Sequence, residues 1–219
     1  VDKGDSHPGE PVLKVSDMHV ASHLYKRDAV NGVTFDVRRG EIVCVAGIDG
    51  NGQTELVEIL TGLKKATHGA ITMNGHDAYN KTPRQLFDMG ISSIPADRHK
   101  HGLVLDFSVE DNLILQNADE KPYSNHGALN FKAIDEHARE LIEKYDIRPR
   151  GCEHEPAGDL SGGNQQKVII AREVTNDKDL LIAVNPTRGL DVGAIEYVHK
   201  YIVDQRNKHK AVLLVSFEL

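Results

Sequence analysis

The chain has 219 residues, of which 39% are hydrophobic and 27% charged, an ordinary balance for a globular protein with one substantial core. Its formal net charge of −7 argues against a nucleic-acid-binding surface, because such a surface needs a basic face. No apolar run approaches the roughly 18 residues of a membrane-spanning helix, so any membrane role must come through a partner.

The first part of the chain alternates strand-like and helix-like segments. Residues 1–11 are rich in proline and glycine and have the character of a linker. After the glycine-rich loop at 47–52, helical spacing predicts a helix over 54–60, and Pro83 opens a helix that Gly90 closes. Apolar alternation or continuous apolar runs predict strands over 12–20, 33–37, 42–46, 70–73 and 91–94.

Helical patterns dominate between about residues 97 and 174, and an α/β pattern then resumes. The expected elements are helices over 109–115, 131–145, 163–174 and 193–205 and strands over 180–184 and 212–215. Alternating strands and helices imply a mostly parallel sheet, and the early strand pair suggests an antiparallel β-subdomain beside it. We predict an α/β domain over 12–219 with a helical subdomain at about 97–174. The abrupt end at Leu219 suggests a truncated C-terminus.

A candidate phosphate-binding loop lies between the strand at 42–46 and the helix at 54–60. Glycines let the backbone wrap around an anion, and the helix N-terminus adds positive charge. Thr54 stands where a hydroxyl would ligate Mg²⁺, but Gln53 stands where such a loop has lysine. In isolation the loop is also compatible with a plain glycine-rich turn. Its residues are Gly47-Ile48-Asp49-Gly50-Asn51-Gly52-Gln53-Thr54, followed by Glu55.

A second candidate anion site opens the helix expected at 163–174. It reads Leu160-Ser161-Gly162-Gly163-Asn164-Gln165-Gln166-Lys167. The Ser161 side chain can cap the helix, and the glycines leave backbone N–H groups exposed. This string resembles the signature motif of ATP-binding-cassette (ABC) proteins, and its ending resembles the second cassette of bacterial sugar and nucleoside importers. The resemblance implies that Ser161, Gly162, Gly163 and Asn164 bind the γ-phosphate of a nucleotide held by the opposite cassette.

Further motifs extend this resemblance over nearly the whole chain from Val12 onward. Residues 180–191 resemble the strand of the second nucleotide motif and the following D-loop, where Asp191 acts across a dimer interface. Residues 94–98 resemble the Q-loop region, and 214–219 the switch-histidine strand. Tyr25 lies at about the right distance before the phosphate loop to stack on adenine, although Leu24 is near the same register. The family implies the P-loop NTPase fold of ABC cassettes.

Five functional side chains depart from the family pattern. Val184 stands in place of the aspartate that anchors Mg²⁺ and has no oxygen to offer. Asn185 stands in place of the glutamate that polarises water, and an amide cannot usefully accept a proton. Phe217 replaces the switch histidine, Ala96 the Q-loop glutamine and Gln53 the lysine. Because phosphoryl transfer depends on positioning and charge neutralisation, we expect this domain alone to be nearly inactive in hydrolysis.

The residues that shape the pocket and those that serve the opposite site are retained. We expect the domain to hold ATP and Mg²⁺ weakly and to supply its signature loop to a competent site on another cassette. The alternatives are a fully active ATPase cassette, a scaffold that no longer binds nucleotide, and a non-transport cassette of the DNA-repair or translation type. The expected ATP contacts are Tyr25, Gly47, Asp49, Gly50, Asn51, Gly52, Gln53, Thr54 and Glu55.

The resemblance also implies the setting of the domain. It points to an ABC importer for simple sugars or nucleosides, and the strings at 184–191 and 217–219 favour nucleosides. The expected partners are a further cassette, fused upstream, transmembrane permease subunits and, indirectly, a substrate-binding protein, with no nucleic acid. The expected location is the cytoplasmic face of the cell membrane.

Two smaller features remain open between chemical and structural roles. Cys44 and Cys152 are far apart and make no disulfide framework, which favours a reduced location. His99 and His101 lie in a polar loop without a Cys or carboxylate cluster, so solvated histidines are favoured over a metal site.

Two parts of the segment 97–115 also allow two interpretations each. Asp97 and Arg98 either pair with each other or face the permease. Residues 103–115 form subdomain core or contact a transmembrane partner. The charged helix over 133–144 is expected to present a solvated face.

Overall fold

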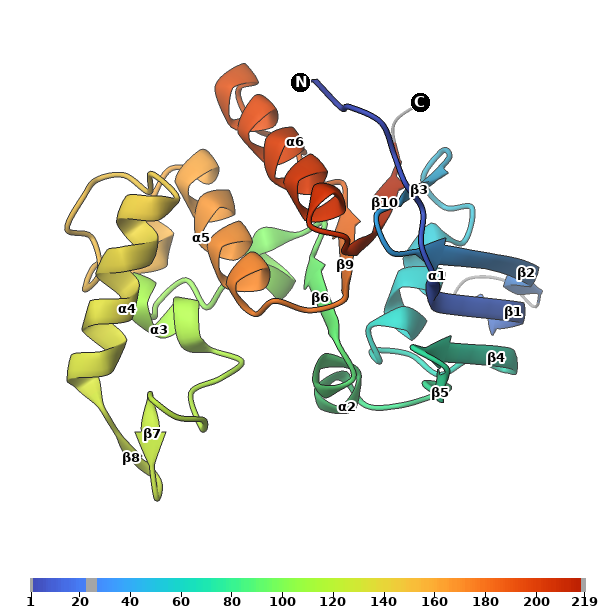
Figure 1. The fold of residues 1–219 in the computed structure, drawn as a ribbon, viewed down its shortest axis with the longest axis horizontal. Coiled ribbons are helices and arrows are strands. Elements are labelled where there is room, and N and C mark those ends of the chain that lie inside the picture. Colours follow the sequence, from blue (N-terminus) through green and yellow to red (C-terminus); the bar gives the residue numbers. More distant parts are fainter. Residues whose placement is uncertain (1, 23–26, 218–219) are drawn as a thin grey trace. The chain divides into compact units, whose positions relative to one another are not determined.

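The computed structural model describes residues 2–22 and 27–217, and these residues form two compact units (Figure 1). The core unit comprises Val1–Ile94, Asp177–Pro186 and Glu196–Leu219. The helical unit comprises Pro95–Asn176 and Thr187–Ile195. Within the described part of the chain, no helix combines the length and the apolar character needed to cross a membrane.

The core unit contains two four-stranded sheets, one antiparallel and one parallel. The antiparallel sheet has the order β2-β1-β4-β5, with β1 (Pro11–Ala21), β2 (Asp28–Arg38), β4 (His68–Met73) and β5 (His76–Asp77). The parallel sheet has the order β3-β10-β9-β6, with β3 (Ile42–Ala46), β6 (Ile91–Ile94), β9 (Leu180–Val184) and β10 (Ala211–Ser216). This arrangement confirms the expected α/β fold with a mostly parallel core sheet and an antiparallel subdomain.

The parallel sheet forms around short apolar runs, which are buried in β9 and mostly buried in β10 and β6, whereas β3 is partly exposed. All five residues of β9 are buried, and β9 pairs in parallel with β10 and β6. Leu180, Ile182 and Leu213 are among the largest fully buried side chains. Parallel pairing places the carboxyl ends of β3, β9 and β10 at one edge, with Ala46 opposite Ser216 and Val215 opposite Val184.

Among the described residues, the helices of the core unit are α1 (Gln53–Leu60), α2 (Pro83–Asp88) and, from Glu196 onward, α6 (Val192–Asn207). A capping box starts α2, because Thr82 Oγ1 accepts the Gln85 N–H at 3.3 Å while the Thr82 N–H donates to Gln85 Oε1 at 2.9 Å. Pro83 occupies the first helical position, as the sequence predicts.

The helical unit is built around α3 (Val109–Ile114), α4 (Phe131–Lys144) and α5 (Gly162–Thr175). Helix α4 buries Ile134, Ala138, Leu141 and Ile142 and exposes its charged face, which confirms the expected solvated side. In α3, Val109, Leu113 and Ile114 are buried, whereas Phe107 before it is 48% exposed. The segment 103–115 therefore contributes to the core and also presents apolar surface.

Several elements differ from their predicted extents. β2 begins at Asp28 rather than near Val33, because its pairing with β1 continues through Asn31 opposite His19 even though Gly32 interrupts the apolar alternation. The two-residue strands β5, β7 (Ser124–Asn125) and β8 (Ala128–Leu129) were not predicted, since two residues carry no period. A π-helical turn at Arg98–Gly102 and a 3₁₀ turn at Ala157–Asp159 were also missed.

Candidate functional site

The glycine-rich loop runs from β3 into α1 and lies directly on β2. Gly52 precedes α1 with a φ of 93°, and a Cβ atom added there would lie 2.2 Å from the Ala29 carbonyl oxygen. Glycine at position 52 is therefore required for this close approach. Because α1 begins at Gln53, the first N–H groups of the helix have no partner within the helix and are available to an anion.

The Gln53 side chain folds back into this loop and is only 6% exposed. Its Oε1 accepts a hydrogen bond from the Asn51 N–H at 3.1 Å, and its Nε2 donates to the Ile48 carbonyl oxygen at 3.2 Å. The amide thus engages a backbone donor of the loop that an anion could otherwise use. A phosphate must compete with this contact and gains no cation from Gln53.

A pocket of about 370 Å³ lies beside the loop, within the core unit. Apolar side chains of β2, β3 and α1 form its walls together with the polar loop, so it suits a ligand with an apolar face and a charged end. Four of the predicted contacts line it, whereas Asp49, Gly50, Thr54 and Glu55 do not; Tyr25 and Leu24 lie outside the described residues. The lining residues are Ala29, Val30, Asn31, Val33, Val45, Ala46, Gly47, Asn51, Gly52, Gln53 and Leu56.

The carboxyl ends of the parallel strands bring Asn185 and Phe217, two positions predicted from the sequence, close to Gly47 at the start of the glycine-rich loop. The Gly47 N–H donates to the Ser216 carbonyl oxygen at 3.1 Å, next to Phe217. The Asn185 Oδ1 accepts the Phe217 N–H at 2.9 Å, and the Asn185 N–H donates to the Val215 carbonyl oxygen at 2.8 Å. The Asn185 amide therefore ties the end of β9 to β10.

The same edge of the sheet offers little to a divalent cation. Val184, at the end of β9, is 4% exposed and has no side-chain oxygen. Thr54 is exposed on α1 and supplies one hydroxyl. Because Mg²⁺ demands a near-octahedral set of oxygen ligands, these residues do not fit a firmly held ion.

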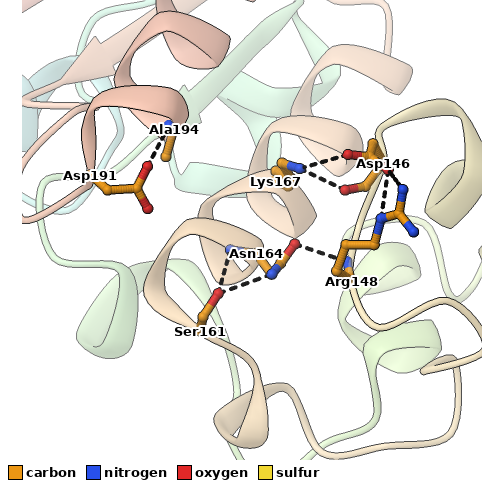
Figure 2. Close-up of polar contacts among 7 residues, drawn as sticks. All are labelled: Asp146, Arg148, Ser161, Asn164, Lys167, Asp191 and Ala194. Atoms are coloured by element: carbon orange, nitrogen blue, oxygen red, sulfur yellow. Dashed lines mark hydrogen bonds and ion pairs between the residues drawn. The ribbon is translucent and has the colours of Figure 1, made fainter.

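The predicted signature residues form a hydrogen-bonded cluster at the start of α5 (Figure 2). Ser161 Oγ accepts from the Asn164 N–H at 3.4 Å and from Asn164 Nδ2 at 2.9 Å. Asn164 Oδ1 accepts the Arg148 N–H at 2.8 Å. Ser161 thus caps the helix as predicted, and the N–H groups of Gly162 and Gly163 remain as first-turn donors for an anion.

Asp146 supports this cluster from the loop after α4. Lys167 Nζ donates to the Asp146 carbonyl oxygen at 2.6 Å and lies 3.4 Å from Asp146 Oδ2 (Figure 2). Although burial acts to raise the pKa of Asp146, hydrogen bonds from Arg148 and Lys167 hold that pKa below its ordinary value. Asp146 and Arg148 were not predicted, because residues this far from the motif along the chain carry no local sequence signal.

The structure also brings the predicted D-loop aspartate to the signature loop. Asp191 Oδ1 accepts the Ala194 N–H at 2.9 Å and so caps the start of α6 (Figure 2). A Cβ atom added to Gly163 would lie 3.8 Å from Asp191 Oδ2 and 3.4 Å from the Ala194 Cβ. Both predicted elements therefore belong to one local structure in the helical unit.

In the region that resembles a Q-loop, Asp97 and Arg98 were expected either to pair with each other or to face the permease. Asp97 Oδ1 accepts the His99 and Lys100 N–H groups, each at 3.0 Å, and the Lys100 bond contributes most to lowering the Asp97 pKa. Arg98 Nη1 instead donates to the Arg188 carbonyl oxygen at 3.1 Å. The pairing of Asp97 with Arg98 is therefore wrong, because the carboxylate caps its own turn.

The histidines of this turn do not form a metal site in the described part of the chain. His99 Nε2 lies 2.9 Å from Gln165 Oε1, and His101 is exposed. The group of side chains with metal-ligand spacing among the described residues is Glu110, Asp135 and His154. Both cysteines are free, with Cys44 exposed and Cys152 buried.

Comparisons with known proteins agree with these motifs. Residues 30–188 match the family described as ABC transporter. The guanosine import ATP-binding protein NupO of Bacillus subtilis is 50% identical over 218 residues, which cover 100% of this chain and 42% of that protein. The nucleoside import ATP-binding protein NupA of Lactococcus lactis is 48% identical over 218 residues, covering 100% of this chain and 43% of that protein. The chain therefore spans less than half the length of these curated relatives.

Solved structures share the fold at lower identity. The dimeric structure of a bacterial ABC transporter cassette superposes with a TM-score of 0.76 and 21% identity, covering 94% of this chain and 88% of that one. A nucleotide-free ATP-binding cassette from an ABC transporter gives a TM-score of 0.77 and 22% identity, covering 96% and 82%. With the matched family and the two near relatives, these findings show that the chain belongs to the ABC transporter family and forms a single ATP-binding cassette.

Proposed function

We propose that this chain is the second ATP-binding cassette of an importer ATPase for nucleosides or simple sugars. Relatives that are 50% and 48% identical across the chain are named for guanosine and nucleoside import, whereas the glucose import ATP-binding protein TsgD13 of Haloferax volcanii is 41% identical. These identities favour a nucleoside substrate. The chain matches 42% of the guanosine importer protein, whose remaining length is sufficient for another cassette of this size.

The proposal that this site is degenerate rests on the hydrogen bonds that the Gln53 side chain makes within the loop. A buried neutral amide pairs with the loop's own backbone where phosphate would bind, and the neighbouring positions 184 and 185 lack a carboxylate. A triphosphate here meets backbone donors but no compensating cation. We infer that this site binds nucleotide weakly and hydrolyses it poorly.

The residues present fit a nucleotide but not a firmly held Mg²⁺. The apolar pocket beside the loop and the free N–H groups at the start of α1 suit a base and its phosphates. Bound ATP would bring anionic charge, and Thr54 would supply a hydroxyl for a cation. Nucleotide held in this way acts as a structural ligand.

The intact signature cluster supports a role at a second site. Ser161, Asn164 and Arg148 fix the start of α5, and its first-turn glycines present backbone donors. We infer that this face binds the terminal phosphate of ATP held by another cassette, with Asp191 beside it. That cassette would lie upstream in the same polypeptide, joined through residues 1–11.

The remaining parts of the proposal concern assembly. Transmembrane permease subunits would hold the cassette at the cytoplasmic face of the membrane, and a substrate-binding protein would act through them. The exposed side chains of Val104, Phe107 and Leu115 offer apolar surface for a permease on the helical unit. The proposed division of the chain is a linker at 1–11 and a cassette at 12–219.

Calorimetric titration of the chain tests the degenerate site. We expect weak binding of ATP, with an affinity that changes less than about threefold between Mg-ATP and ATP with EDTA, because few Mg²⁺ ligands are present. Tight, Mg²⁺-dependent binding, or hydrolysis at the rate of an ordinary transporter cassette, would contradict the proposal. Complete absence of binding would favour a scaffold cassette instead.

The signature function is tested in the full-length protein by Gly163→Asp, which places an anion at the start of α5. The added Cβ makes only ordinary contacts, the nearest at 3.4 Å, so the fold should persist. We expect ATP hydrolysis to fall about 10²-fold, as when a transition-state donor is lost. The control Asn125→Asp adds the same charge at an exposed position of β7. Equal activity of both variants would disprove the signature role.

A further inference from the structure

The guanidinium of Arg98 lies against the first residue of α5. A Cβ atom added to Gly162 would lie 3.0 Å from Arg98 Nη2, 3.6 Å from Cζ and 3.8 Å from Nε. The same Nη2 would lie 3.8 Å from a Cβ atom on Gly189, and Nη1 donates to the Arg188 carbonyl oxygen. The Arg98 side chain thus packs between the signature loop and the segment that leads to Asp191.

This position is electrostatically unfavourable for an isolated cation. The N-terminus of a helix carries partial positive charge, and the first turn of α5 contains no acidic residue to offset it. Within the described part of the chain, the printed partner of the Arg98 guanidinium is a backbone oxygen rather than a carboxylate, and the neighbouring Asp97 caps its own turn. The acidic group at this loop, Asp191, lies on the Gly163 side, with its Oδ2 3.8 Å from a Cβ atom added there. Two sources of positive charge therefore meet at one loop.

Part of the guanidinium also lacks a hydrogen-bond partner. The Arg98 Nε atom is buried and has no acceptor among the described residues. Leaving a buried donor unpaired is costly, so this placement is expected to be maintained by another interaction. An anion at the start of α5 would pair with the guanidinium, which no carboxylate bonds directly among the described residues.

The π-helical turn that carries Arg98 is bonded to α5 through Arg172. Arg172 of α5 donates to the Gly102 carbonyl oxygen at 2.8 Å and to the Asn112 carbonyl oxygen at 3.2 Å. Arg172 Nε also donates to Glu173 Oε1 at 2.9 Å, in a buried pair. The backbone of the π-helical turn is thus fixed to α5, and the side chain of Arg98 is positioned relative to the signature loop before any ligand arrives.

We propose that Arg98 binds the terminal phosphate of a nucleoside triphosphate presented to this signature loop by another cassette. The inference rests on the proposed function of the loop and adds a residue to it. The Gly162 and Gly163 N–H groups supply directed donors, and Arg98 supplies the full positive charge that the loop otherwise lacks. Glycine at position 162 leaves the space in which the guanidinium lies.

The test compares Arg98→Met and Arg98→Lys in the full-length protein, assembled with its permease. Methionine keeps much of the side-chain length but removes the charge. We expect Arg98→Met to lower kcat/KM for ATP about 10²-fold and Arg98→Lys to recover at least about tenfold of that loss. Equilibrium binding should weaken for ATP and stay unchanged for ADP, because ADP lacks the terminal phosphate.

Controls separate this inference from a structural role and from the proposed function. Arg150→Met removes an exposed arginine, 3.8 Å from Glu143, and should leave kcat/KM unchanged. Equal weakening of ATP and ADP binding, or no recovery with lysine, would show that Arg98 only braces the loop. Normal hydrolysis by Arg98→Met while Gly163→Asp is inactive would overturn the inference and leave the signature function intact. Normal hydrolysis by both variants would instead reject the signature function.

Discussion

The Oε1 atom of Gln53 lies 3.1 Å from the backbone nitrogen of Asn51 and accepts its hydrogen bond. A phosphate-binding loop works because its backbone donors converge on an anion and a lysine balances the charge. Here a neutral side chain engages one of those donors, and Nε2 completes the contact through the Ile48 carbonyl oxygen. If this loop binds phosphate as proposed, its backbone donors act without a cation from position 53.

Substituting Gln53→Lys should strengthen nucleotide binding. The ammonium group would replace a neutral amide near the phosphates, and charge-assisted hydrogen bonds are worth about 1.5–3 kcal/mol, so ATP affinity should rise about tenfold or more. Calorimetry on the chain measures this directly. Asn125→Lys, which adds the same charge at an exposed position of β7, should leave the affinity unchanged. An equal gain in both variants would reflect net charge rather than the loop.

Hydrolysis should not return with the lysine alone, because the neutral amide of Asn185 cannot usefully accept a proton from water. Asn185 instead contributes to stability. Its amide accepts the Phe217 N–H at 2.9 Å, and its φ is 39°, a conformation that Asn and Asp tolerate better than Ala. We expect Asn185→Ala to lower the free energy of unfolding by about 1–2 kcal/mol and Asn185→Asp, which keeps the acceptor, by much less. Urea unfolding of the two variants distinguishes them. Equal losses would mean that the contact with Phe217 contributes nothing.

The end of the β1–β2 pair contains a pH-sensitive contact. His19 Nδ1 lies 3.1 Å from Asp28 Oδ2, and Nε2 lies 3.2 Å from Asp17 Oδ1. The hydrogen bond to Asp28 contributes most to raising the His19 pKa above 6.5, with help from Asp17 and against the opposing effect of burial. Because the folded-state pKa is raised, the stabilisation is fully present below the unfolded-state pKa and is lost as pH rises through the folded-state value.

We therefore expect the unfolding midpoint of the parent to fall relative to that of His19→Gln as pH rises from about 5.5 to 8.5. His68 also contacts Asp17, with 3.3 Å between His68 Nε2 and Asp17 Oδ2, and its titration affects both proteins. The quantity to compare is therefore the difference in unfolding midpoint between the parent and His19→Gln at each pH. NMR titration of the His19 ring gives an independent value. A His19 pKa at or below 6.5 would contradict this prediction, as would a constant difference across the range.

The sequence predicts the parts of the fold in which local pattern and tertiary role agree. Residues 180–184 form a strand because every side chain is apolar and every one is buried. Ser161 caps α5 as expected from its type and position, and Pro83 starts α2. These assignments depend on neighbours within a few residues, which the sequence displays directly.

The contacts that define the site depend on residues far apart and could not be predicted. Arg98 lies against Gly162 because the π-helical turn that carries it is bonded to α5, partly through Arg172 and the Gly102 carbonyl oxygen. The replacement of lysine by Gln53 was visible in the sequence, but the way its amide folds onto Asn51 was not, because that depends on the burial of the loop against β2. Side-chain direction is set by packing, which periodicity does not report.

A pair of glycines tests how closely the glycine-rich loop must approach β2. Gly50 and Gly52 have similar φ values, 89° and 93°, so alanine is strained at both and costs about 1 kcal/mol from the backbone alone. A Cβ atom at Gly50 meets nothing within 4 Å, whereas at Gly52 it would lie 2.2 Å from the Ala29 carbonyl oxygen. Gly52→Ala must therefore also displace the loop from β2.

We expect Gly52→Ala to lower the free energy of unfolding by about 2 kcal/mol more than Gly50→Ala, in the range typical of steric overpacking. It should also weaken ATP binding, because Ala29 and Val30 line the pocket that the displaced loop would deform. Urea unfolding and calorimetric titration of both variants give the two quantities. If the two alanines cost the same and weaken ATP binding equally, backbone conformation alone decides the outcome, and the contact between the loop and β2 does not shape the pocket beside the loop.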